Sequence, residues 1–276
     1  MEIFDFHAHI YPEKIARKAV QSVGHFYGIE MDCDGTARTL VEKGKESGVS
    51  RFLVQSVATS PAQVCSINDF IAGECALYPE LTGFGTLHPD MERPFDEIKR
   101  IQALGLKGVK FHPDTQKFYM DDQRLFKIYD ALSQSGLPVL MHCGDYRYSY
   151  SHPQRLARVL GNFPSLTVVA AHFGGWSLWD LALEYLKDKK CFVDCSSSIM
   201  FLGKVRSREL IKAYGAERVL YGTDFPMWDE KEEIARVQSL GLSHSELELI
   251  FSGNAKRVLG LSLIHISEPT RRTPIS

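Results

Sequence analysis

Three short segments in the middle of the chain are almost continuously apolar, and each ends in a histidine. They cover residues 106–112, 137–142 and 166–172, so that His112, His142 and His172 follow one another at equal spacing. Segments that are apolar on both faces are typical of buried parallel strands, which need a crossover of a dozen or more residues between them. Helical patterns at about 121–135 and 153–161 fill the two connections. The middle of the chain therefore predicts a parallel sheet covered by helices.

The same alternation of strand and helix extends over most of the chain. Strands are predicted at 3–10, 52–57, 81–87, 106–112, 137–142, 166–172, 191–195 and 218–224. The other predicted helices cover 12–23, 36–47, 94–103, 178–187 and 205–214, with two more opened by capping boxes at Ser60 and Ser243, the last of them running through Leu259. Eight strand–helix units in this length predict a single (β/α)8 TIM barrel. The competing fold, an open doubly wound sheet, is disfavoured because no G-x-G-x-x-G follows the first strand.

The end of the chain does not fit this pattern. Residues 262–276 lie beyond a complete final helix, lack an amphipathic period and resemble translated adaptor sequence. We therefore expect one domain at 1–261 and a non-native tail at 262–276.

The first predicted strand carries two histidines at alternate positions. Regular alternation would place Asp5, His7 and His9 on one face and Phe4, Phe6 and Ala8 on the other. At a rise of ~3.3 Å per residue the two histidine Cα atoms lie roughly 6.6 Å apart, so both rings can reach one divalent cation. A metal site is the natural interpretation of this segment.

Polar side chains of the kind that bind metals also end the other strands. Besides His7 and His9, they are His112, His142, His172 and Asp224. Because working groups of a TIM barrel lie at the C-terminal ends of its strands, these residues should meet at one mouth. Imidazole with carboxylate suits zinc, manganese, iron or cobalt, and zinc lowers the pKa of bound water to about 7.

Several motifs together resemble a known family. They are Phe4-Asp-Phe-His-Ala-His9, Lys107-Gly-Val-Lys-Phe-His-Pro113, His142-Cys-Gly144, Ala171-His-Phe-Gly-Gly175, Tyr221-Gly-Thr-Asp-Phe-Pro226 and Gly253-Asn-Ala-Lys-Arg-Val-Leu-Gly260. This ordered set is similar to the amidohydrolase superfamily, and more narrowly to the amidohydrolase-related branch that includes aminocarboxymuconate semialdehyde decarboxylase.

The resemblance implies a role for each strand-end residue. It implies that His7, His9, His142 and Asp224 hold one divalent metal, which we expect to be zinc. His172 would orient or deprotonate water, and Asp224 would share in proton transfer. A second metal held by His172 and a carboxylated Lys110 is the less favoured alternative, because the motif around Lys110 resembles the mononuclear branch.

Substrate contacts are expected from the same barrel mouth. We predict that Lys110, His112, Arg147 and Trp176 bind the substrate. The loop at 144–152 is rich in tyrosine and carries Arg147, whose guanidinium group could hold a carboxylate. Trp176 follows a metal-site motif and could form a wall of the pocket.

Composition excludes several partners. A net charge of −2 provides no basic surface for nucleic acid, and no apolar run is long enough to span a membrane. Six cysteines without a CxxC pair, and no basic N-terminal leader, predict reduced thiols in a cytoplasmic protein. We expect a small-molecule substrate, with a homodimer as one open arrangement.

Three functions remain. The first is a metal-dependent hydrolase in which activated water attacks an amide, lactone or related acyl carbon. The second is a nonoxidative decarboxylase of an aromatic or unsaturated acid, and the third is a metal-binding barrel without catalysis. The compact chain favours hydrolysis, because decarboxylases of the branch named above usually carry extra loops.

Overall fold

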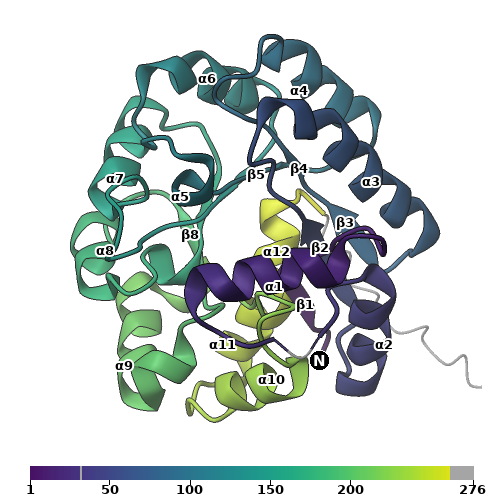
Figure 1. The fold of residues 1–276 in the computed structure, drawn as a ribbon. Coiled ribbons are helices and arrows are strands. Elements are labelled where there is room, and N and C mark those ends of the chain that lie inside the picture. Colours follow the sequence, from purple (N-terminus) through teal and green to yellow (C-terminus); the bar gives the residue numbers. More distant parts are fainter. Residues whose placement is uncertain (32, 262–276) are drawn as a thin grey trace, which may run out of the picture.

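The computed structural model describes residues 1–31 and 33–261 and confirms the predicted (β/α)8 barrel. The helices surround the strands, and α1 lies across the front of the ring (Figure 1). Residues 262–276, for which we predict a non-native tail, lie outside the described part of the chain. The strands are β1 (Phe4–His9), β2 (Arg51–Gln55), β3 (Leu81–Gly83), β4 (Gly85–Thr86), β5 (Val109–Phe111), β6 (Val139–Met141), β7 (Val168–Ala170), β8 (Phe192–Asp194) and β9 (Val219–Leu220).

Every pair of neighbouring strands is parallel, in the orders β1-β2-β3 and β4-β5-β6-β7-β8-β9. Only Phe84 separates β3 from β4, so these two strands together correspond to the single strand predicted at 81–87. At the other end of the order, Phe6 N–H donates to Tyr221 O (2.9 Å) and His9 N–H donates to Phe225 O (2.7 Å). These bonds join β1 to the segment that directly follows β9, and they close the ring of strands.

β1 contains an irregularity that the sequence pattern does not reveal. Asp5 pairs with Phe52, but Ala8 pairs with Val54, so β1 has one more residue than β2 between these two pairs. Such a β-bulge changes the face on which the following side chains lie. The bulge lies between Asp5 and Ala8, so Asp5 does not share a face with the two histidines, and this part of the prediction is wrong.

Two apolar clusters follow from this arrangement. The smaller one takes residues from several strands, including Phe6, Leu53 and Leu140, and is covered by Ala255 and Val258 of the last helix. It fills the space inside the strands. Ala8 belongs instead to the larger cluster between strands and helices. Phe6 and Ala8 thus pack on different sides, as the bulge requires.

The helices are α1 (Ala16–Tyr27), α2 (Ala37–Ser47), α3 (Val64–Leu77), α4 (Pro94–Ala103), α5 (Pro113–Gln116), α6 (Phe126–Gln134), α7 (Pro153–Asn162), α8 (Trp179–Leu186), α9 (Ile199–Tyr214), α10 (Glu230–Gln238), α11 (His244–Glu248) and α12 (Asn254–Val258). None of the helices in the described part is long and apolar enough to cross a membrane.

Four helices differ clearly from the prediction. α9 begins at Ile199 rather than at residue 205, and α5 was not predicted. α1 begins at Ala16 rather than at Pro12, because residues 13–15 form a turn, and it continues to Tyr27 before Gly28 ends it with a left-handed backbone. α10 was not predicted. It is capped by Asp229, whose carboxylate accepts hydrogen bonds from the backbone N–H groups of Lys231 and Glu232.

Gly144, in the loop after β6, provides a test of this packing. Its φ is +78°, and an added Cβ would lie 2.4 Å from the backbone carbon of Gly175 in the loop after β7. We expect Gly144→Ala to lower the free energy of unfolding by about 2–4 kcal/mol, as measured by denaturant unfolding.

Gly161→Ala is the matched control. Gly161 lies in α7, and a Cβ there meets no heavy atom within 4 Å. It should change stability by no more than about 1 kcal/mol, in the favourable direction. Equal unfolding midpoints for the two variants would contradict the proposed close contact between the two loops.

Candidate metal centre and active site

His7, His9 and Asp224 meet at the barrel mouth, with ligand atoms within 4.8 Å of one another. The two Nε2 atoms are 3.2 Å apart, and Asp224 Oδ1 lies 3.4 Å from that of His7 and 3.5 Å from that of His9. The other oxygen, Oδ2, accepts a hydrogen bond from the Ser197 hydroxyl at 2.6 Å. This leaves Oδ1 directed at the two imidazoles.

The backbone holds these groups together. The N–H of Asp224 donates to the carbonyl oxygen of His7 at 2.7 Å. His172, Ser197 and Asp224 all have positive φ, between 48° and 65°, which non-glycine residues rarely adopt. Strain of this kind persists at functional sites when the surrounding structure imposes it.

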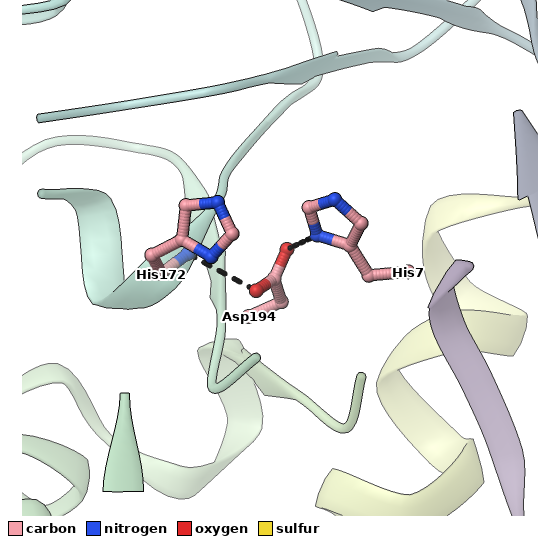
Figure 2. A group of neighbouring side chains, drawn as sticks. All are labelled: His7, His172 and Asp194. Atoms are coloured by element: carbon pink, nitrogen blue, oxygen red, sulfur yellow. Dashed lines mark hydrogen bonds and ion pairs between the residues drawn. The ribbon is translucent and has the colours of Figure 1, made fainter. Parts of the chain in front are cut away.

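Asp194, at the end of β8, orients two of the predicted residues (Figure 2). Its Oδ2 accepts a hydrogen bond from His7 Nδ1 at 2.9 Å, and its Oδ1 accepts one from the backbone N–H of His172 at 3.0 Å. Because Nδ1 of His7 carries the proton, Nε2 presents its lone pair to the cluster. Carboxylates behind metal-binding histidines fix the tautomer in this way. Asp194 is not among the predicted site residues, although it lies one residue before the end of the seventh predicted strand.

His142 and His172 face each other with two lone pairs. His142 Nε2 lies 3.1 Å from the carbonyl oxygen of Gly144, and His172 Nδ1 lies 3.1 Å from that of Ser196. A carbonyl oxygen only accepts, so both nitrogens carry hydrogen. In neutral rings the remaining nitrogens, which are 3.1 Å apart, both hold lone pairs. Such a pair repels unless a cation lies beside it.

These observations fit a divalent cation. His172 links the two parts of the site, since its ring centroid is 5.1 Å from that of His7 and 4.9 Å from that of His142. His142 itself does not join the compact group of His7, His9 and Asp224. The four predicted ligands therefore lie at one mouth of the barrel. His7, His9 and Asp224 form a compact group, and the His172 ring lies between this group and His142.

A second group, His112, Asp114 and His142, is less suited to a metal. The two rings stack with centroids 3.8 Å apart and planes 9° from parallel. Lone pairs lie in the ring plane, so parallel stacked rings do not direct them at one ion. Asp114 accepts a hydrogen bond from Ser151 and lies 3.5 Å from His142 Nε2, behind that ring.

Burial controls the charges at the site. It lowers the pKa of His9 and His142 well below the usual value and that of His172 to about 4, so these rings are neutral at pH 7. Burial also lowers the pKa of Lys110 to about 8. For Asp224, burial opposes ionisation, but the neighbouring histidines and Ser197 outweigh it and keep the pKa well below normal.

A cavity of about 970 Å³ opens from this cluster and is mostly apolar. Helix α1 forms part of its wall and covers the mouth (Figure 1). Its aromatic lining consists of Tyr11, Phe26, Tyr27, Phe70, Tyr148, Tyr150 and Trp176. Lys18 and Lys117 line it as exposed cations, whereas its two acidic residues, Asp114 and Asp224, are buried. The cavity therefore suits a ring compound with an anionic group.

Three of the four predicted substrate-binding residues line the cavity, and Arg147 does not. Lys110, His112 and Trp176 line the cavity, and Lys110 Nζ is 3.0 Å from His7 Nε2. Arg147 is instead engaged within the protein. Its guanidinium group binds Asp145 through two nitrogens, at 2.9 Å and 2.7 Å, and donates to Phe26 O at 2.6 Å. It ties the loop after β6 to the end of α1.

Comparison with known proteins agrees with this geometry. The sequence profile of the family described as Amidohydrolase matches residues 4–261. An uncharacterized TIM-barrel protein from Bordetella bronchiseptica is similar in structure, with 22% identity, a TM-score of 0.76, and coverage of 95% of this chain and 99% of that chain.

Two further similar structures have named activities. A dihydroxybenzoic acid decarboxylase from Polaromonas sp., with bound manganese, has 15% identity, a TM-score of 0.73 and coverage of 94% and 97%. A candidate 2-pyrone-4,6-dicarboxylic acid hydrolase from Pseudomonas putida has 17% identity, a TM-score of 0.69 and coverage of 95% and 98%. Other similar structures are decarboxylases of aromatic acids.

Replacing Asp194 tests the metal site. Asp194→Asn removes the charge that fixes the His7 tautomer, and we expect metal to bind about 10- to 100-fold more weakly. The measurement is competition with a chelator, together with the metal content of purified protein, which should be near one ion per chain before substitution.

Asp180→Asn is the control, because Asp180 is an exposed carboxylate that pairs with Arg206 on α9. Metal affinity should be unchanged in this variant. An unchanged affinity in Asp194→Asn would show that the His7 orientation does not depend on this carboxylate.

Proposed function

The chain belongs to the amidohydrolase family, and we propose that within this family it is a metal-dependent hydrolase of small acyl compounds such as amides or lactones. The observation that carries this proposal is the neutral imidazole of His172. Its Nδ1–H donates to Ser196 O, so the Nε2 lone pair faces the cluster. A lone pair in this position can accept a proton from water, as a general base must.

We propose that His7, His9, His142 and Asp224 hold one ion, with zinc favoured and manganese, iron or cobalt as alternatives. When bound, such an ion would polarise a carbonyl or carboxylate oxygen and make water more acidic. Lys110, buried beside His7, adds a cationic group that can neutralise charge on the substrate.

The hydrolytic reaction can be assigned to the residues of the chain. His172 Nε2 takes a proton from the attacking water, while Ser196 and Asp194 hold the ring in place. A bond forms between the water oxygen and the acyl carbon, the bond to the leaving nitrogen or oxygen breaks, and the leaving group receives the proton that His172 accepted from water. Asp224, whose Oδ1 lies 3.4 Å from His7 Nε2, is the second group able to transfer a proton.

Decarboxylation is the second candidate. In that reaction the bond between the carboxyl carbon and the ring or chain carbon that carries it breaks. Carbon dioxide leaves, and the ring or chain carbon takes up a proton in its place. Support comes from the aromatic-acid decarboxylases among the similar structures and from the apolar cavity with cationic side chains. Those structures are covered almost completely by this chain, so its compactness does not favour hydrolysis.

Turnover distinguishes the two reactions. Metal-loaded protein is incubated with amides and lactones of ring compounds, and in parallel with aromatic and muconate acids. We expect new carboxylic acid from the first set and no carbon dioxide from the second. Carbon dioxide release with an inert first set would replace hydrolysis by decarboxylation, and no turnover of either set would favour a noncatalytic barrel.

Removing the base provides a separate test. We expect His172→Gln to lower kcat by about 10²- to 10⁴-fold because water loses its proton acceptor. Metal content should stay near one ion per chain, as measured by elemental analysis. His244→Gln is the control, since His244 is exposed on α11 and pairs with Glu248.

Two results would change this assignment. Full activity in His172→Gln would exclude it as the base. A wild-type content near two ions, falling to one in the variant, would instead make His172 a ligand of a second metal.

A further inference from the structure

Tyr27 lies at the end of α1 and lines the cavity beside the predicted site. Its ring centroid is 6.4 Å from that of His142 and 5.4 Å from that of Trp176. The helix was predicted to end at Val23, and its extension to Tyr27 brings this tyrosine to the mouth. Tyr27 takes no part in the proposed proton transfers.

The hydrogen bonds around His112 determine where the Tyr27 proton points. The backbone N–H of Thr115 donates to His112 Nδ1 at 3.4 Å, so this nitrogen carries a lone pair. In the neutral ring the proton is then on Nε2, which lies 2.8 Å from the Tyr27 hydroxyl oxygen. His112 therefore donates and Tyr27 accepts. In the described part of the chain, no other group lies within hydrogen-bond distance of this hydroxyl.

The phenol ring is firmly held. The edge of Tyr27 packs against Trp176 with planes 73° apart, and the Arg147 guanidinium carbon lies 5.4 Å from the Tyr27 ring centroid. Arg147 is itself fixed by Asp145 and by the carbonyl oxygen of Phe26. A donor held by its surroundings loses little conformational freedom on binding, so its hydrogen bond contributes more fully to affinity.

We propose that Tyr27 is a specificity-determining residue whose phenolic O–H donates a hydrogen bond to an acceptor oxygen on the substrate, remote from the reacting group. His112 directs the proton into the cavity, and it lies outside the compact group of His7, His9 and Asp224, where the reacting group is expected. The substrate class is therefore a ring-bearing acid or acyl compound with an ether, carbonyl or hydroxyl oxygen on its distal part. This inference rests on the proposed function, because it assumes that the reacting group lies at the metal end.

The test compares ligands that differ in one acceptor atom. Calorimetry with metal-loaded full-length protein measures Kd for 3-methoxybenzoate against 3-ethylbenzoate, and for 4-methoxybenzoate against 4-ethylbenzoate. The two members of each pair have nearly the same volume, but only the methoxy substituent offers a hydrogen-bond acceptor at that position. We expect wild-type protein to bind the methoxy member of at least one pair about ten-fold more tightly.

In Tyr27→Phe this preference should fall to about one-fold, while the affinity for the ethyl ligand and the metal content stay unchanged. Tyr119→Phe is the control. Tyr119 is exposed and does not line the cavity, so the preference should persist there. His112→Ala should also reduce the preference, because the hydroxyl proton is then no longer directed.

Equal affinities within both pairs in wild-type protein, failure of all four ligands to bind, or a preference that survives Tyr27→Phe would each overturn the inference. These results differ from a failure of the proposed function. Hydrolytic turnover without any dependence on Tyr27 would reject only the role of this residue, and absent turnover with an intact methoxy preference would reject only the reaction.

Discussion

The active site depends on hydrogen bonds between the first strand and the segment after the last one. Asp224 N–H donates to His7 O, and His9 N–H donates to Phe225 O, both at 2.7 Å. These bonds close the ring of strands and, at the same place, bring an aspartate to two histidines more than 200 residues away in the chain. Backbone geometry thus sets the distances between the ligand atoms before any cation contributes. The left-handed backbone of Asp224 is tolerated because these bonds hold it.

Two local features refine this arrangement. The bulge in β1 allows Phe6 to pack inside the strands while the histidines, two residues apart, still meet at the mouth. Asp194 then selects the tautomer of His7 and holds the backbone of His172, so one buried carboxylate orients two working groups. Its pKa is about 2 despite burial, because His7, His172 and Ser196 stabilise the charged form. The Asp194 carboxylate is therefore ionised in the folded protein at neutral pH.

The amount that sequence predicts depends on how local each feature is. The strands and most helices follow from apolar periodicity and capping residues, and the resemblance leads to His7, His9, His142, His172 and Asp224. The bulge could not be predicted, because alternation in one strand says nothing about the register of its neighbour. Arg147 looked available for a substrate, but its partners Asp145 and Phe26 O become visible only when the loop meets α1. Asp194 lay one residue before the end of the predicted strand 191–195, so a criterion limited to the final residue of each strand did not include it.

Closure of the ring also has a consequence for the order of events during synthesis. The two histidines of β1 emerge from the ribosome more than 200 residues before Asp224, which follows β9. Contacts between such distant segments form only after the intervening chain has been ordered. Until Asp224 has been synthesised, the nascent polypeptide therefore exposes an incomplete chelating pair, and the barrel gains its full affinity for an ion only after that point.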